Sequence, residues 1–195
     1  MAPPIAVAVT GGIGAGKSEA LQAFARHGAA VVSSDEIVHH LLLQPDVKDA
    51  VVARMGNGIV APGGEIDRGA LATVVFNDRA ALAWLEELLH PLVAAEYLRW
   101  REALAELPDA PAVCVTEVPL LYETGGESRF DKVVVITAPS KLRKARSIVA
   151  TEDRESRLID DREKIERADY SFKNIGSLEE LDAFVASVLD DLARA

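Results

Sequence analysis

Residues 11–18 read Gly11-Gly12-Ile13-Gly14-Ala15-Gly16-Lys17-Ser18, which fits the P-loop pattern GxxxxGK[ST] at every fixed position. A short apolar run at residues 5–9 precedes this stretch and is typical of a buried strand. Residues 19–27 follow it with a helical pattern that Gly28 ends. Strand, glycine-rich loop and helix are the context that this pattern needs, and we therefore expect a nucleotide-binding P-loop here.

The residue types in this loop suit the negative charge of a nucleotide polyphosphate. Glycines allow backbone N–H groups to point inward, and the first turn of the following helix adds unpaired N–H groups. Lys17 is expected to reach the β- and γ-phosphates, and the Ser18 hydroxyl is expected to bind Mg²⁺. The alternative is a glycine-rich turn that carries an exposed lysine, and the flanking strand and helix argue against it.

Composition and charge exclude several classes of partner. The chain has 195 residues, of which 49% are apolar, so it can bury a sizeable core as one domain with an insertion. Its formal net charge of −10 argues against a nucleic-acid or membrane-surface binder, because either would need a basic face. Residues 141–167 nevertheless hold nine Lys and Arg against seven Asp and Glu. This segment is where an acidic protein would gather positive charge for an anionic ligand.

The single cysteine, Cys114, lies in an apolar run and is expected to be a buried thiol in a reducing compartment. The N-terminal apolar run is too short for a signal peptide, and no later stretch approaches the length of a membrane span. We therefore expect a cytoplasmic protein that does not contact a membrane. The oligomeric state stays open, with a monomer favoured.

The rest of the chain alternates predicted strands and helices. Further strands are predicted at residues 29–32, 112–117, 132–137 and 168–172, and residues 46–107 are predicted to be mostly helical. The longest helical pattern begins at residue 79 and is expected to break at His90-Pro91, because a residue before proline disfavours helical geometry. Five strands with helices between them and one helical insertion predict an α/β three-layer sandwich.

Two carboxylates are expected at the ends of predicted strands, where an open α/β sheet binds its ligands. Asp35 follows the second predicted strand and could face the P-loop, although a cap for the helix predicted at residues 36–43 is the more common use of such an aspartate. Glu117 ends the third predicted strand and could hold Mg²⁺ through water, as a Walker-B acid does.

The basic segment after the fourth predicted strand has two interpretations. Arginines that close over a transferred phosphoryl group are expected in a P-loop enzyme on electrostatic grounds. A solvated helix with many ion pairs would show the same mixture of charges. The candidates for a phosphate contact are Arg143, Arg146, Arg154 and Arg157.

Six landmarks in order give the sequence a resemblance to the dephospho-coenzyme A kinase family over nearly its whole length. They are Thr10 to Ser18, Ser34-Asp35-x-Ile37 with His39, Gly64-x-Ile66-Asp67-Arg68-x-x-Leu71 leading to Phe76, Leu85-Glu86 with His90-Pro91, Pro119-Leu120-Leu121-x-Glu123, and Ala168-Asp169 with Asn174-x-Gly176-Ser177. The P-loop alone is shared by many unrelated enzymes, so the other five landmarks carry the resemblance.

The resemblance implies a P-loop kinase with a five-stranded parallel sheet, a helical CoA-binding domain and a lid. By this likeness the core is residues 1–45, 110–139 and 167–195, the substrate domain is 46–109, and the lid is 140–166. The implied reaction moves the γ-phosphoryl group of ATP to the ribose 3′-hydroxyl of dephospho-CoA, with Mg²⁺ bound. Family membership would therefore make the protein a phosphotransferase of coenzyme A biosynthesis.

The resemblance also implies roles for single residues. Asp35 matches the general base, which reverses the preference for a helix cap, and Arg146 matches the lid arginine that meets the phosphates. The matches in the substrate site are His39, Arg68, His90 and Leu120. Asn174 and Gly176 match the loop near the adenine.

The sequence departs from the family pattern at three places. Ser33 stands where a first aspartate is usual, Glu117 stands where an aspartate is common, and the lid is shorter, with Ala150 at an expected arginine. Two other functions stay open on the sequence alone. One is a kinase for another small hydroxyl compound, such as shikimate or a nucleoside monophosphate, and the other is a nucleotide-binding regulatory protein without activity.

Overall fold

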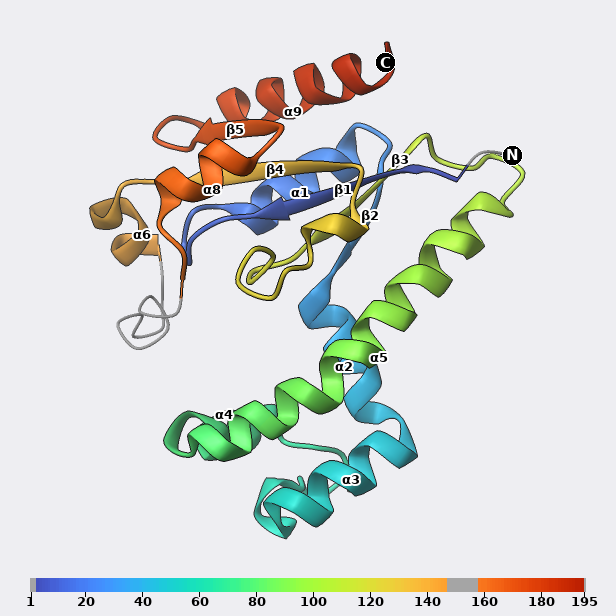
Figure 1. Cartoon of the computed structure of the whole chain (residues 1–195), viewed down its shortest axis with the longest axis vertical. Coiled ribbons are helices and arrows are strands. Elements are labelled where there is room, and N and C mark those ends of the chain that lie inside the picture. The colour runs from blue at the N-terminus through green and yellow to red at the C-terminus, as the bar shows by residue number, and fades with distance from the viewer. Residues whose placement is uncertain (1–2, 147–157, 195) are drawn as a thin grey trace. The chain divides into compact units, whose positions relative to one another are not determined.

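The computed structural model describes residues 3–146 and 158–194 and divides into two compact units (Figure 1). The first unit comprises Met1–Ser34 and Arg101–Ala195, and the second comprises Asp35–Trp100. The predicted segments at residues 147–157, which include Ala150, Arg154 and Arg157, lie outside the described residues.

The first unit is built on a parallel sheet of five strands with the order β2-β3-β1-β4-β5. The strands are β1 (Ile5–Thr10), β2 (Ala30–Ser33), β3 (Val113–Glu117), β4 (Lys132–Thr137) and β5 (Tyr170–Lys173). The predicted α/β fold with a five-stranded parallel sheet is confirmed, and the predicted bounds of β4 match those observed. Because β1 is central, the loop that follows it leaves the sheet between the ends of its neighbours.

Among its described residues, the unit contains α1 (Lys17–Arg26), α6 (Ser140–Arg146), α8 (Asp161–Arg167), α9 (Leu178–Leu192), the end of α5 (Arg79–Ala105) and a 3₁₀ turn η2 at Glu127–Arg129. Helices α1 and α9 pack on one face of this sheet, and α8 and the segment after β3 lie on the other. Val7 and Val9 of β1 pack in one cluster with Phe24 of α1 and Val185 of α9. Ala8 lies between them in sequence and packs on the opposite face, in a cluster with Leu121. This alternation is the two-residue period of a strand buried on both faces.

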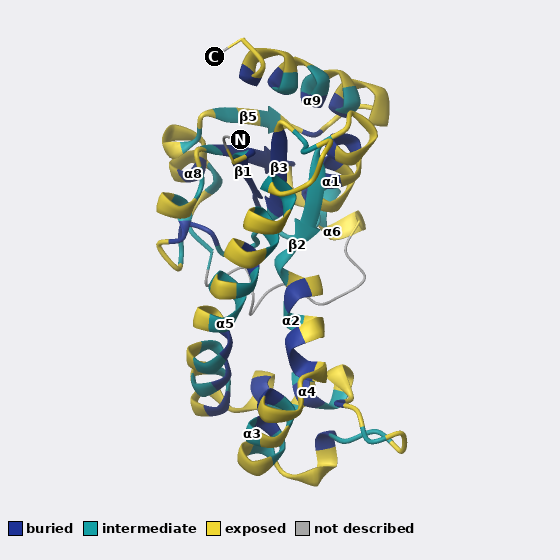
Figure 2. Cartoon of the chain, turned by 90° about the vertical axis from the view of Figure 1, so that its right-hand side faces the viewer, coloured by how far each residue is buried: buried dark blue, intermediate teal, exposed yellow. Residues whose placement is uncertain are grey.

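Helix α9 has one buried face and one exposed face, which Figure 2 shows in dark blue and yellow. Its buried residues are Leu181, Val185, Val188 and Leu192, which recur every three or four positions as an amphipathic helix requires. The N-cap is Ser177, whose hydroxyl accepts a hydrogen bond from the Glu180 N–H. Ser177 therefore caps the start of the last helix.

The second unit is helical, as predicted for the insertion. It contains α2 (Ser34–Leu43), α3 (Pro45–Met55), the 3₁₀ turn η1 (Asn57–Ile59), α4 (Arg68–Asn77) and most of α5 (Arg79–Ala105). Asp67 caps α4, because its Oδ1 accepts from the N–H groups of Gly69 and Ala70 at 2.9 and 3.0 Å. Val51 and Ile59 are fully buried within this unit.

The predicted break at His90-Pro91 is wrong, since α5 continues through both residues. Proline removes one backbone hydrogen bond and disfavours helical geometry in the residue before it, but the cost is finite. Leu85 and Leu89 before the proline and Tyr97 after it are all buried. Burial of this continuous stripe outweighs the cost. The Glu87 carbonyl lacks the N–H donor that a residue other than Pro91 would supply, and both residues are exposed, so water can bind there instead.

Candidate active site

The P-loop begins at the end of β1, and its glycines adopt backbone geometries that other residues avoid. Gly11 has φ +144° and lies so close to β4 that a Cβ on it would be 1.9 Å from the Ile136 carbonyl oxygen. Gly16 has φ +101° and occupies the N-cap position of α1. A side chain at either position would be strained, so glycine is required for the loop to pass this close to the sheet.

Lys17, Ser18 and Glu117 come together where β1 and β3 end. Val9 pairs with Glu117 across the sheet, which brings the carboxylate to the first turn of α1. The Lys17 Nζ lies 3.2 Å from the Gly12 carbonyl oxygen and 4.0 Å from the Glu117 Oε1. The Ser18 Oγ donates to the Glu117 Oε2 at 3.1 Å. A buried cation and a hydroxyl–carboxylate pair therefore stand at the start of the helix.

The Ser18 and Glu117 oxygens fit the chemistry of Mg²⁺, which prefers hard oxygen ligands and commonly takes one or two carboxylates together with phosphate oxygens. In the described ranges, 3–146 and 158–194, no group of three or more His, Cys, Asp and Glu is placed to hold a metal ion. A cation at Ser18 and Glu117 would thus need further oxygens from water or from a bound nucleotide.

Asp35 lies in the first turn of α2, one residue after Ser34 begins the helix. The alternative that Asp35 caps this helix is wrong, because the helix starts before it. Asp35 is exposed, and in the described parts of the chain its carboxylate has no hydrogen bond or ion pair. Its position in the other compact unit leaves its use as a base toward the P-loop a prediction.

Two of the four candidate arginines lie on α6, in the same unit as the P-loop. The Arg143 Nη1 sits against Gly12, where a Cβ would approach it to 2.0 Å, and it lies 3.9 Å from the Asp161 Oδ2. The Arg146 Nη1 donates to the Asn174 carbonyl oxygen at 3.4 Å. The structure thus places one guanidinium group beside the P-loop and the other beside the loop after β5.

Other cations of the basic segment have structural partners that the sequence did not reveal. Lys164 is fully buried, and its Nζ lies 2.7 Å from the Glu123 Oε1. Arg167 forms an ion pair with Glu127 and lies over the Tyr122 ring, with its Cζ 4.3 Å from the ring centroid. Burial raises the pKa of Tyr122 above 10.0, and the Arg167 charge offsets part of this rise. These contacts attach α8 to the loop after β3.

Asp169, in another of the landmarks, also has a structural role. Its Oδ1 accepts from the Lys132 Nζ at 2.9 Å, and its Oδ2 accepts from the Val133 N–H at 2.8 Å. The hydrogen bond to Asp169 raises the pKa of Lys132 above 10.5. The carboxylate therefore ties the start of β5 to the start of β4.

Asn174 is buried at the end of β5, and its side-chain Nδ2 donates to the Ala15 carbonyl oxygen of the P-loop at 2.9 Å. Gly176 follows in the exposed turn before α9. Both residues are thus in the unit that carries the P-loop, and Asn174 contacts the loop directly. A position near the adenine stays a prediction.

A family model described as dephospho-CoA kinase matches residues 5–180. The chain belongs to the dephospho-CoA kinase family. The dephospho-CoA kinase of Symbiobacterium thermophilum is 37% identical over 187 residues, which cover 92% of this chain and 77% of that protein. The one from Mesorhizobium japonicum is 35% identical over 201 residues and 96% of each chain. A solved dephospho-CoA kinase from Campylobacter jejuni has a TM-score of 0.72 at 28% identity, with 97% of each chain covered.

Family membership makes the chain a kinase that uses ATP to phosphorylate dephospho-CoA in coenzyme A biosynthesis. The predicted family and the predicted activity are both confirmed. The two other functions considered from the sequence, another small-molecule kinase and an inactive regulatory protein, are not needed to explain the matches.

The residues expected to bind dephospho-CoA are dispersed over several elements. His39 is exposed on α2, and its ring stacks on that of His40 with centroids 6.1 Å apart. Arg68 is exposed at the first position of α4, and His90 is exposed in the middle of α5. Leu120 lies in the turn after β3, in the P-loop unit.

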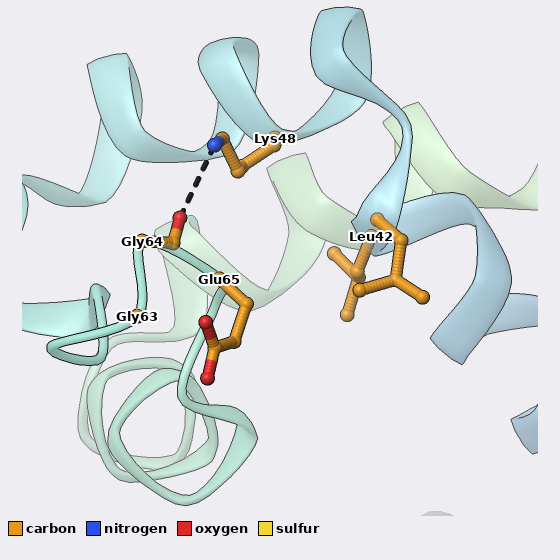
Figure 3. Close-up of a pocket in the computed structure, with 6 residues that line it drawn as sticks. Leu42, Lys48, Gly63, Gly64 and Glu65 are labelled. Carbon is orange, nitrogen blue, oxygen red and sulfur yellow. Dashed lines mark hydrogen bonds between the residues drawn. The ribbon is translucent and has the colours of Figure 1, made fainter.

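The helical unit contains a small pocket of about 220 Å³ (Figure 3). Its lining residues are Leu42, Leu43, Lys48, Gly63, Gly64 and Glu65. The Lys48 Nζ donates to the Gly64 carbonyl oxygen at 3.1 Å and joins α3 to the loop before α4. None of the residues expected to bind substrate lines this pocket.

One departure from the family pattern has a clear position. Ser33 ends β2 and pairs directly with Glu117 of β3. The side chain that replaces the usual aspartate therefore stands at the strand end next to the Glu117 carboxylate.

No helix among the described residues is long and apolar enough to cross a membrane.

Proposed function

We propose that the P-loop unit binds ATP with Mg²⁺ and that the γ-phosphoryl group moves directly, in line, to the ribose 3′-hydroxyl of dephospho-CoA. The new bond joins the 3′-oxygen to the γ-phosphorus, the bond from that phosphorus to the β-phosphate oxygen breaks, and ADP leaves. The observation that carries this proposal is the convergence of Lys17, Ser18 and Glu117 at the strand ends. Positioning and electrostatics supply most of the rate of such a transfer.

The loop Gly11-Gly12-Ile13-Gly14-Ala15-Gly16 would surround the phosphates with backbone N–H groups, and Lys17 would turn toward the β- and γ-phosphates. Burial of Lys17 strengthens its attraction for phosphate, because little water screens it. Its 4.0 Å separation from Glu117 is loose enough for a phosphate to replace this contact. Ser18 would bind Mg²⁺ directly and Glu117 through water. The metal would neutralise phosphate charge and help to orient the nucleotide.

Asp35 is proposed as the base that accepts the proton of the 3′-hydroxyl. Its carboxylate is exposed and, among the described residues, has no hydrogen bond or ion pair. His39, Arg68, His90 and Leu120 are proposed to contact dephospho-CoA. Arg68 is suited to the diphosphate of this substrate, since a guanidinium group binds phosphate oxygens in pairs.

Arg146 is proposed to stabilise charge on the transferred phosphoryl group, with Arg143 beside it and Arg154 and Arg157 as further lid arginines. Their positions support this proposal, since Arg143 lies against Gly12 of the P-loop and Arg146 donates to the Asn174 carbonyl. Arg146 is exposed, so its guanidinium can move from the Asn174 carbonyl to a phosphate at little cost. We keep residues 140–166 as the proposed lid, residues 46–109 as the substrate domain and the remainder as the nucleotide-binding core.

Two substitutions test the assignment of roles. Lys17→Ala and Asp35→Asn should each lower kcat for dephospho-CoA by at least about a hundredfold, because one removes a phosphate contact and the other the proton acceptor. A matched control is Asp46→Asn, which changes an exposed aspartate in the first turn of α3 and should keep the wild-type rate. An Asp35→Asn enzyme with a near-normal kcat would remove Asp35 as the base.

The environment and assembly of the protein are proposed on chemical grounds. Cys114 is buried and is the only cysteine, which suits a reducing compartment such as the cytoplasm. No step of the proposed reaction uses a second copy, and we expect a monomer. Light scattering coupled to size exclusion should give the mass of one chain, and a larger mass would contradict this expectation.

A further inference from the structure

Asn174 connects three parts of the nucleotide-binding unit. Its backbone N–H donates to the Thr137 carbonyl at the end of β4, with 2.7 Å between nitrogen and oxygen. Its carbonyl oxygen accepts from the Arg146 guanidinium on α6. Its side-chain Nδ2 donates to the Ala15 carbonyl oxygen of the P-loop at 2.9 Å, in a buried contact. Only 6% of the residue is exposed.

Gly16, the residue after Ala15, leaves space for the Asn174 amide because it has no side chain. A Cβ on Gly16 would lie 2.3 Å from the Asn174 Nδ2, closer than two such atoms can approach. The orientation of the amide follows from chemistry, because a carbonyl oxygen can only accept a hydrogen bond and must therefore meet the NH₂ group. The left-handed backbone at Gly16 and the buried amide of Asn174 thus fit each other.

The hydrogen bond from Asn174 to the Ala15 carbonyl also fixes the direction of the neighbouring Gly16 N–H. The peptide unit is planar and trans, so the Ala15 C=O and the Gly16 N–H lie in one plane and point in opposite directions. A hydrogen bond that holds the carbonyl toward Asn174 therefore directs the Gly16 N–H away from Asn174. In a P-loop, backbone N–H groups of this kind bind the phosphates of the nucleotide.

We propose that Asn174 is a positioning residue for phosphate binding, and that it orients the Ala15–Gly16 peptide so that the Gly16 N–H faces the polyphosphate. Its side-chain amide acts on the phosphate end of the nucleotide through Ala15 and does not read the base. This inference rests on the proposed function only in that the P-loop binds a polyphosphate.

The test compares ligands with and without a base. Calorimetry would measure the binding of ATP, GTP and inorganic tripolyphosphate to the wild-type protein, Asn174→Ala and Asn174→Asp at neutral pH. Both variants lack the buried donor and should bind all three ligands more weakly, by about tenfold and by a similar factor for each. The control is Asn77→Ala, which removes an amide-to-carbonyl hydrogen bond of 2.7 Å to Thr73 on α4 and should change none of these affinities.

The pH dependence of tripolyphosphate binding by Asn174→Asp separates a positioning role from a general loss of stability. A protonated aspartic acid carries one O–H donor, which can replace the amide toward the Ala15 carbonyl. The affinity of this variant for tripolyphosphate, relative to wild type at the same pH, should therefore recover as the pH falls. Asn174→Ala has no such group and should show no recovery. Thermal unfolding of each variant would confirm that the measurements are made on folded protein.

Two results would overturn the inference. In the first, tripolyphosphate binding is unchanged in both variants while the preference for ATP over GTP is lost, which would make Asn174 a reader of the base. In the second, every affinity is unchanged. Because binding needs no acceptor, a wild-type protein that binds tripolyphosphate but does not phosphorylate dephospho-CoA would contradict the proposed function alone.

Discussion

Two lysines, Lys17 and Lys164, are almost completely buried, and each lies near a glutamate carboxylate. The Lys164 Nζ lies 2.7 Å from the Glu123 carboxylate, whereas the Lys17 Nζ lies 4.0 Å from that of Glu117. A close buried pair holds its partners in place, and a loose pair leaves a desolvated cation that a phosphate can attract. The distances thus distinguish a structural lysine, Lys164, from Lys17, which we propose binds phosphate.

Removing one member of the close pair should destabilise the protein strongly. Glu123→Ala leaves the Lys164 charge buried without a partner and also removes the acceptor of the Ile159 N–H, so we expect a loss of about 3–5 kcal/mol. The double variant Glu123→Leu with Lys164→Met should recover most of this loss, because it leaves no buried charge. Chemical denaturation measures both.

The control for this prediction is Glu166→Ala, which breaks the exposed pair with Arg162 on the same helix. An exposed pair of this kind is worth less than about 1 kcal/mol, so the variant should remain close to wild type. A Glu123→Ala protein as stable as this control would contradict a structural role for the buried pair.

The sequence predicted one of these lysines and not the other. Lys17 belongs to the local P-loop motif, and its place in the pattern GxxxxGK[ST] is enough to identify it. Burial of Lys164 depends on contact with the loop after β3, about 40 residues earlier in the chain, and no local pattern signals it. Arg143 was one of four candidate arginines, but its contact with Gly12 joins distant segments and could not be predicted from a local pattern.

At the scale of elements, α5 shows where a local rule and a longer pattern disagree. The residue before a proline disfavours helical geometry, yet the buried positions Ala81, Leu85 and Leu89 repeat every four residues up to His90-Pro91. The apolar pattern decides the outcome, because the whole stripe loses its burial if the helix ends early. The spacing of apolar residues along the whole segment therefore predicts this helix better than the single proline does.

The proline still costs stability, and its replacement should show this. Pro91→Ala restores a backbone N–H and an i to i−4 hydrogen bond to Glu87, so we expect the free energy of unfolding to rise by up to about 3 kcal/mol. Thermal unfolding followed by circular dichroism measures the change, and Glu87→Ala is a control on the same exposed turn. A fall in stability would mean that the helix at this position depends on the proline ring.

The contact between α1 and α9 should depend on pH. Hydrogen bonds from Arg26 and His27 lower the pKa of Asp182 below its usual 3.8. A carboxyl group with a lowered pKa in the folded state stabilises the fold above its unfolded pKa. This contribution is lost as the pH falls through the folded value. Asp182→Asn should therefore lower the Tm at pH 7, and the difference from wild type should shrink below about pH 4.

The control for the pH dependence is Asp190→Asn, which changes an exposed aspartate on the same helix. Its Tm should follow the wild-type value over the whole range. A Tm difference for Asp182→Asn that stays constant into acid would show that packing, and not the charge of Asp182, holds the two helices together.

At the scale of the whole molecule, an acidic chain gathers positive groups around one loop. The net charge is −10, yet Lys17, Arg143 and Arg146 all lie at the P-loop or at the loop that contacts it. The fold class and the family could be predicted because strand, loop and helix patterns are local and their order survives in the sequence. The strand order β2-β3-β1-β4-β5 could not, since it depends on pairings between segments far apart.

If this P-loop unit serves a kinase for dephospho-CoA, the protein should prefer dephospho-CoA over other acceptors of phosphate. Formation of ADP would be followed with ATP, Mg²⁺ and each of four acceptors: dephospho-CoA, AMP, adenosine and shikimate. We predict turnover with dephospho-CoA at a kcat/KM at least about a hundredfold above that for any other acceptor. Equal turnover with shikimate or AMP, or no turnover with dephospho-CoA, would contradict it.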